Sequence, residues 1–347
     1  MMTEPSDFDA LPGLVLGFTQ SGQNLQEKHI AMAVRKAGFV GRTDVLLRIL
    51  EQAEFNKIRI PAPIAREGFR GFTVLAKLPS KRTVIKAVKG ARYLRNLLGQ
   101  QDSLALGEYK SAVAALEKAG KTQRGIESEL GSEPVGVTKD PVALGTLAGV
   151  TSMASKRFNE GLDHGGYTAE YIKKMFKPEI WDTMKKKLQH PWNSVYDATD
   201  APYDVIREAF HDRRADVTDL NVLIDSLQTA EEVLNNTATL ILNPPPLTPA
   251  TSDLHDSLLN PKHGLTKEKM KAHAVEVAAL AKRLRLEIPL MQQTLAKWID
   301  AMADDGVRVM NWTPDDTRFR MDGTKKKYDW AAGELVKKGV GVEEAKA

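Results

Sequence analysis

The sequence contains no cysteine, and this absence removes several kinds of chemistry at once. Disulfide bonds, zinc sites with thiolate ligands and cysteine nucleophiles are all excluded. The sequence also lacks an apolar run long enough to cross a bilayer, so we expect no membrane span. The start of the chain, residues 1–10, holds acids and no base, unlike a secretory signal or a typical organellar transit peptide. An organellar address would have to be internal, or part of a leader would have to precede this numbering.

Motifs that carry catalysis or bind metals are missing as well. The seven histidines include no pair at the i, i+4 spacing of a metal site, and no Gly-x-Ser-x-Gly elbow is present. Gly120-Lys121-Thr122 ends a relaxed phosphate-loop pattern, but helical periodicity precedes it and the glycine-rich turn is absent. We therefore expect no enzymatic activity, no cofactor, no metal and no small-molecule substrate.

Charge is plentiful but unevenly distributed. The 347 residues carry a net charge of only +4, and the length is enough for about two domains. Residues 57–95 hold eleven bases and a single acid, Glu67, whereas residues 197–256 hold twelve acids and three bases. A chain with two oppositely charged regions favours a charged partner on one side, with the acidic region facing protein or solvent.

Helical periodicity dominates the chain, and no stretch alternates as a sheet strand would. Four amphipathic helices are expected between residues 24 and 98, and a fifth from Ser103 to a glycine stop at Gly120. Short helices are expected at 168–177 and 179–189. A helical stretch at 216–242 has a Thr229/Glu232 capping box, and two further helices meet near Pro289. The predicted fold is all-α, with antiparallel helical hairpins, partly solenoid-like, joined by extended linkers.

Composition shifts predict the domain organisation. An N-terminal approach segment (1–23) precedes a basic helical-hairpin domain (24–130), a linker rich in glycine and proline (131–150), and a second helical domain (151–310). The second domain contains a stiff, proline-rich spacer at 243–251. A polar, basic arm (311–347) is expected to close the chain.

The helix after Pro79 gives the sharpest functional signal. On a helical wheel, Arg82, Lys86, Lys89 and Tyr93 point away from an apolar face made of Val84, Ala87, Val88, Ala91, Leu94 and Leu98. Solvated helices usually mix both signs of charge, so the near absence of acids favours contact with a polyanion such as RNA. The full set of expected nucleic-acid-binding residues is Lys57, Arg59, Arg66, Arg70, Lys81, Arg82, Lys86, Lys89, Arg92, Tyr93, Arg95, Lys325, Lys326 and Lys327.

One hairpin has a recognisable pattern. Its residues are Ala33-Val-Arg-Lys-Ala-Gly38, then Ile49-Leu-Glu-Gln-Ala-Glu54, then Lys57-Ile-Arg-Ile-Pro61. This segment resembles a pentatricopeptide-like hairpin, as in the degenerate repeats of mitochondrial RNA-binding and mitoribosomal proteins of fungal type. The resemblance implies RNA association or residence in a mitochondrial ribosome, with rRNA and neighbouring proteins as partners. Later units depart from the repeat period, so no base-by-base code is carried over.

Two functions remain open at this stage. The first is a non-enzymatic helical scaffold that contacts RNA, as a component or partner of a mitochondrial ribosome. The second is a helical protein–protein adaptor or assembly factor whose basic face meets an acidic partner. Ion pairs between the outward cations and the chain's own acids would favour the second.

Overall fold

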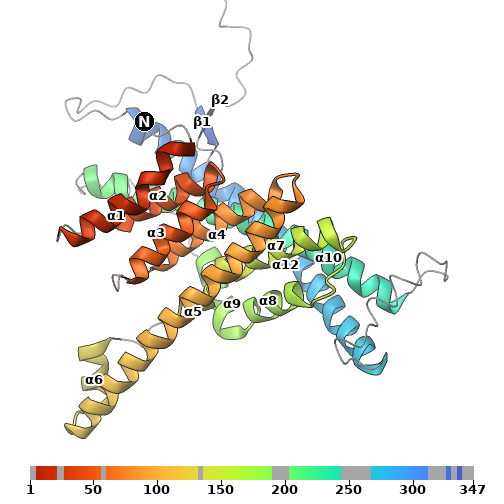
Figure 1. Ribbon diagram of the computed structural model, residues 1–347, viewed down its shortest axis with the longest axis horizontal. Helices are drawn as coiled ribbons and strands as arrows, with labels where there is room; N and C mark the ends of the chain where they lie inside the picture. Colours follow the sequence, from red (N-terminus) through yellow and green to blue (C-terminus); the bar gives the residue numbers. More distant parts are fainter. Residues whose placement is uncertain are drawn as a thin grey trace, which may run out of the picture. The chain divides into compact units, whose positions relative to one another are not determined.

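A computed structural model describes residues 5–21, 27–55, 60–131, 136–189, 203–243, 267–311, 326–329 and 334–337 (Figure 1). Helices account for nearly all of these residues, which confirms the all-α prediction. Their bounds are η1 (Pro5–Ala10), α1 (Leu11–Gln20), α2 (Glu27–Phe39), α3 (Thr43–Phe55), α4 (Ala62–Lys77), α5 (Lys81–Lys118), α6 (Gln123–Leu130), η2 (Val137–Lys139), α7 (Pro141–Phe158), α8 (Tyr167–Met175), α9 (Pro178–Gln189), α10 (Tyr203–Leu242) and α12 (Lys267–Asn311).

A short two-stranded ribbon was not expected from the sequence. Its strands are β1 (Lys326–Asp329) and β2 (Glu334–Lys337), which pair antiparallel with Lys327 opposite Val336. Four residues a strand is below the usual length, and the ribbon lies in the predicted C-terminal arm.

The chain forms two compact units. Unit 1 comprises residues 1–182 and 226–284, and unit 2 comprises residues 183–225 and 285–347. The long helices α10 and α12 each contribute to both units. The predicted boundary at 131–150 therefore lies within unit 1, and the division of the chain differs from the one expected.

Helices α4 and α7 form the centre of unit 1. Helix α4 packs against α2, α5 and α7, and α7 also packs against α5 and α8. Every residue of α7 from Pro141 to Ser152 is buried, so this part of the helix is enclosed on all sides, and the hydroxyls of Thr146, Thr151 and Ser152 donate to backbone carbonyls of α7 itself. The expected extended linker over 131–150 is thus wrong for residues 141–150. Pro141 occupies the first helical turn and Asp140 caps it through Ala143 N–H, which is why a proline-containing stretch begins a helix here.

Two glycines let α2 and α4 cross at very short range. A Cβ atom on Gly38 would lie 2.8 Å from Gly71 Cα, and one on Gly71 would lie 2.9 Å from Gly38 Cα. Gly38 is the next-to-last residue of α2, which ends at Phe39, and it serves as a packing residue. Glycine here gives up helix propensity in exchange for close contact between the backbones.

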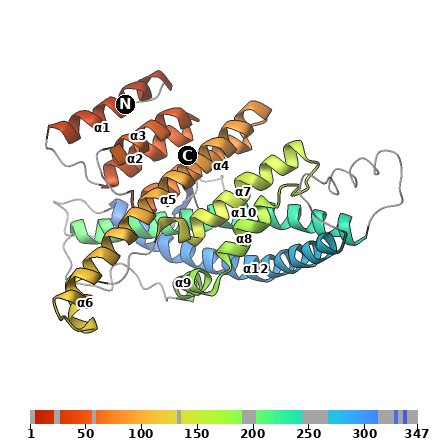
Figure 2. The same ribbon diagram turned by 60° about the horizontal axis from the view of Figure 1, so that its bottom comes forward.

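Helix α5 is longer than expected. A helix break near Ser103 was predicted, but one helix runs from Lys81 to Lys118 and ends before Gly120, whose φ is +77°. Its buried residues all lie between Val84 and Leu98, and none of residues 99–118 is buried. In two views the second half of α5 extends away from α4 and α7, with α6 at its end (Figures 1 and 2).

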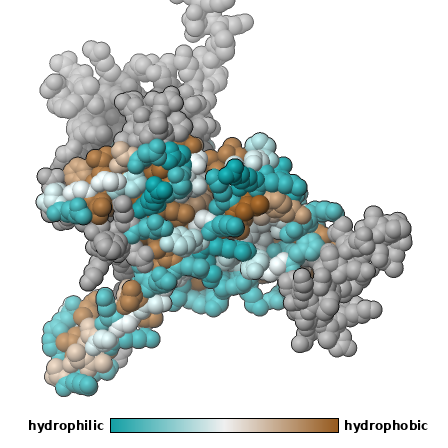
Figure 3. Space-filling view, in the orientation of Figure 1, coloured by the Kyte–Doolittle hydropathy of each residue, from teal (hydrophilic) through white to brown (hydrophobic). Residues whose placement is uncertain are grey.

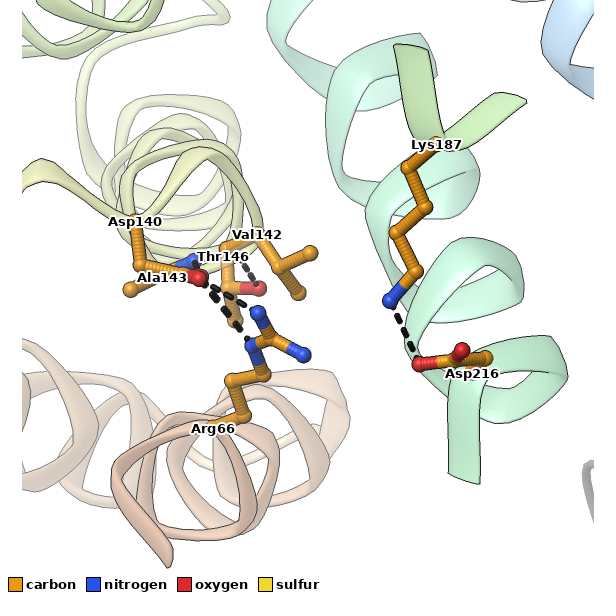
Figure 4. Close-up of polar contacts among 7 residues, drawn as sticks. All are labelled: Arg66, Asp140, Val142, Ala143, Thr146, Lys187 and Asp216. Atoms are coloured by element: carbon orange, nitrogen blue, oxygen red, sulfur yellow. Dashed lines mark hydrogen bonds and ion pairs between the residues drawn. The ribbon is translucent and has the colours of Figure 1, made fainter. Parts of the chain in front are cut away.

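Two other predicted helix boundaries are also wrong. Thr229 lies inside α10 and starts no helix, and Pro289 lies inside α12. The spacer at 243–251 falls outside the described residues, apart from Asn243. Within unit 2, Lys187 of α9 forms an ion pair with Asp216 of α10 at 2.5 Å (Figure 4).

Candidate nucleic-acid interface

The first half of α5 presents the outward face that its sequence predicts. Val84, Ala87 and Leu94 are fully buried, whereas Arg82, Lys86 and Lys89 are exposed and Tyr93 is 46% exposed. Seven residues separate Arg82 from Lys89, which corresponds to about 10 Å along the helix axis. We call Arg82, Lys86, Lys89 and Tyr93 the cationic row. The surface over this half of α5 is largely hydrophilic, while residues of both kinds mix at the far end (Figure 3).

The cations of this row have no acidic partner in the part of the chain that the structure describes. Among the residues that the structure describes, no ion pair joins Arg82, Lys86 or Lys89 to a carboxylate. The first acid of α5 is Asp102, and its carboxylate accepts hydrogen bonds from the backbone N–H groups of Val137 and Thr138. Within the described part of the chain, the charge of the row is thus left without an acidic partner.

Three neighbouring cations of α5 lie over aromatic rings. Lys81 Nζ is 5.9 Å from the ring centroid of Phe158, and the guanidinium carbon of Arg92 is 4.1 Å from that of Tyr167. The guanidinium carbon of Arg95 is 5.4 Å from the ring centroid of Tyr171, which is only 3% exposed. Burial raises the pKa of the Tyr171 hydroxyl above its ordinary value, against the opposing effect of Arg95 and Arg92. The Tyr171 phenol stays neutral, and the contact between Arg95 and the Tyr171 ring packs α5 against α8.

The sequence does not predict these ring contacts, because no helical period connects the rings with one another or with α5. Phe158 is the last residue of α7 and Tyr167 the first of α8, with an intervening turn that contains Gly161, Gly165 and Gly166. Only the tertiary fold brings them beside α5. Their spacing in the sequence carried no signal that could have found them.

Arg66 and Arg70 are engaged inside unit 1. Arg66 of α4 reaches Asp140 at 2.5 Å, so one carboxylate both caps α7 and holds α4 (Figure 4). Arg70 is buried and bonds Glu67 at 3.0 Å, and the same carboxylate accepts from Arg35 of α2 at 2.5 Å. Both arginines therefore tie helices together, and we leave them out of the outward surface.

The remaining expected site residues cannot be placed beside α5. Lys57, Arg59 and Lys325 lie outside the described residues. Lys326 and Lys327 belong to β1, whose backbone alone is described. Their role stays a prediction.

The described residues hold no other candidate site. No group of three or more histidines and acids suited to a metal ion occurs among them, and no helix within them is long and apolar enough to span a membrane. At Gly120-Lys121-Thr122 the preceding element is a helix, and Lys121 forms an ion pair with Glu129. A phosphate loop follows a strand, so this segment is a helix end.

Comparison with known proteins supplies a family. No curated protein and no solved structure matches the chain significantly. A family model described as mitochondrial ribosomal protein mS27 matches residues 1–282. This match does not confirm the pentatricopeptide-like resemblance, which stays a prediction. The matched residues are more than half of the chain. The chain therefore belongs to the mitochondrial ribosomal protein mS27 family and is a structural component of the mitochondrial ribosome.

Proposed function

We propose that this protein is a non-enzymatic helical scaffold that contacts RNA in the mitochondrial ribosome through the cationic row of α5. A ribosomal protein works within a complex of rRNA and proteins, and its family leaves open which of the two this face meets. The observation that carries the proposal is the row itself. Its three cations are exposed, have no ion pair among the described residues, and are mounted on a helix whose opposite face is buried.

Electrostatics favours RNA as the partner of the cationic row. Each phosphate neutralised by a lysine or arginine releases counterions, and this gain does not require a specific sequence. A rigid helix holds its cations at fixed spacing, so they lose less freedom on binding than cations in a loop. Arg82, Lys86 and Lys89 lie at i, i+4 and i+7 and therefore share one line along α5.

A protein partner is the second candidate, because two large side chains interrupt the polar surface. Ile85 and Tyr93 are both exposed beside the cations. Protein interfaces are enriched in aromatic residues, with charges at their rim. An acidic protein could therefore occupy the same face, and the chain would then act as an adaptor.

Charge reversal distinguishes the two. We expect the triple substitution Arg82→Glu, Lys86→Glu and Lys89→Glu to weaken binding of the full chain to homopolymeric single-stranded RNA by about tenfold or more. The slope of log K against log salt should also become shallower by about 2, since about 0.7 ions are released per contact. Titration at several salt concentrations measures both quantities.

A matched control separates local contact from net charge. Lys36, Lys110 and Lys118 are exposed on α2 and on the far half of α5, and changing all three to Glu alters net charge equally. This control should lose little affinity. Unchanged RNA binding after the reversal in the row would contradict the proposal and leave the adaptor as the better function.

A further inference from the structure

Of the three aromatic rings that contact cations of α5, two are exposed and one is buried. Tyr171 is buried and packs α8 against α5 through Arg95. Phe158 and Tyr167 are 39% and 44% exposed, so the core does not use most of their surface. We call Phe158 and Tyr167 the aromatic rim.

The aromatic rim runs beside the cationic row. Its α5 partners, Lys81 and Arg92, are eleven residues apart, or about 16 Å along the helix. On the helical wheel these partners lie to one side of the cationic row, roughly 80–100° from Arg82, which is the middle one of its three cations. Aromatic surface therefore borders the row on that side, at the end of α7 and the start of α8.

Local structure fixes the position of Tyr167. Gly166 has φ +64°, a conformation that suits glycine, and turns the chain into α8. A Cβ on Gly165 would lie 2.5 Å from the Tyr167 ring, so the backbone of Gly165 lies close against this ring. Two hydrogen bonds of Asp163 hold this turn in place. Its backbone N–H donates to Thr237 Oγ1 of α10 at 2.9 Å, and its carboxylate accepts from Ala169 N–H of α8. The ring is held before any partner arrives.

Cations next to exposed aromatic rings are the usual parts of a surface for single-stranded nucleic acid. Bases stack on rings, and phosphates follow the positive groove. In an RNA duplex the base faces are covered by their neighbours, so a duplex could use the cations but not the rings. We propose that unpaired nucleotides of RNA stack on Phe158 and Tyr167 while their backbone follows Arg82, Lys86 and Lys89. This inference rests on the proposed function and adds the kind of RNA.

The test compares two RNAs and two aromatic variants. The full chain is titrated with a single-stranded RNA of about twelve nucleotides and with a duplex of the same length, at one salt concentration. We expect Phe158→Ala with Tyr167→Ala to weaken single-strand binding about tenfold or more and to leave duplex binding within about twofold. Tyr167→Phe, which keeps the ring, should bind as the unmodified chain does.

Phe18→Ala with Phe39→Ala is the matched control, because both rings are exposed to a similar degree on α1 and α2. Loss of single-strand binding in this control as well would overturn the inference. Equal loss for both RNAs on removing the rim would also overturn it, since the rings would then act only by orienting Lys81 and Arg92.

The inference and the proposed function fail in different ways. If the aromatic variant binds single strands normally while reversal of the row abolishes binding, the stacking site is wrong and the RNA contact stands. If reversal of the row changes nothing for either RNA, the proposed function fails, and the stacking site fails with it.

Discussion

At the scale of single residues, Asp163 shows how one buried carboxylate organises a turn. It is only 6% exposed, and it connects the start of α8 to Thr237 of α10. Burial raises the pKa of Asp163 above its ordinary 3.8, against the opposing effect of the N–H groups of Ala169 and Thr168. The hydrogen bonds are therefore made at an electrostatic cost once the carboxyl ionises.

We expect Asp163→Asn to change the pH dependence of stability. Because the folded chain holds this proton more tightly than the unfolded chain, the carboxyl contributes most stability below pH 3.8 and loses it as pH rises through the raised pKa. Asparagine stays neutral and can still accept from Ala169 N–H. The free energy of unfolding of Asp163→Asn relative to the unmodified chain should therefore rise with pH from about 3.8.

Urea denaturation at a series of pH values measures this difference. Asp163→Ala, which removes the acceptor of the Ala169 N–H, is the control: its stability relative to the unmodified chain should follow the same pH dependence, and it should be less stable than Asp163→Asn by about 1 kcal/mol at every pH. A difference between Asp163→Asn and the unmodified chain that does not vary with pH would show that burial leaves this carboxyl unaffected.

At the scale of helices, the sequence predicts which face of a helix is exposed better than it predicts where the helix ends. The face of α5 follows from a 3.6-residue period and from the absence of acids before Asp102, and both features are local. The predicted breaks near Ser103, Thr229 and Pro289 relied on capping patterns and on proline, but α5, α10 and α12 run through them. A local signal of this kind is worth about 1–3 kcal/mol, which packing along a long helix can offset.

The predicted set of site residues differs from the observed surface for a similar reason, because contacts between helices are not visible in local sequence patterns. The cationic row could be predicted because its residues are neighbours on one helix, whereas Phe158 and Tyr167 reach α5 only through the packing of α7 and α8. Arg66 and Arg70 looked equally cationic in the sequence. Their acids, Asp140 and Glu67, become partners in the fold, and for Arg66 the partner is 74 residues away.

The crossing of α2 and α4 gives a prediction at this scale. We expect Gly71→Ala to destabilise the chain by about 1–3 kcal/mol or more, because the added carbon would meet backbone, Gly38 Cα, at 2.9 Å and one helix must move. Gly107→Ala is the matched control, since a Cβ there meets nothing within 4 Å. In a helix interior this control should stabilise by about 0.5–1 kcal/mol.

Chemical denaturation of both variants, followed by circular dichroism, checks the difference in sign. If Gly71→Ala were as stable as Gly107→Ala, the added Cβ would not meet Gly38 Cα at 2.9 Å, and α2 and α4 would lie further apart than described. The pair of glycines would then reflect no packing requirement.

At the scale of the whole molecule, the net charge of +4 conceals a strong local field. The acids of residues 197–256 nearly balance the bases of residues 57–95 in the total, yet they do not pair with the cationic row within the described residues. A modest net charge would let the protein carry the proposed polyanion site without general attraction to nucleic acid. The site should therefore matter inside the ribosome, where its partner is fixed in place.

Sedimentation of the mitochondrial ribosome tests this expectation in the assembly. We expect the unmodified chain, expressed with a tag in its native cells, to sediment with the ribosome. The variant with Glu at the positions of Arg82, Lys86 and Lys89 should move into the free fraction as the salt concentration is raised. The Lys36, Lys110 and Lys118 control should remain bound at the same salt concentration. Mild ribonuclease treatment identifies the partner, because an RNA contact should be released by it and a protein contact should not. Retention of the triple variant at every salt concentration would mean that other surfaces hold the chain and that α5 contributes little to its place in the ribosome.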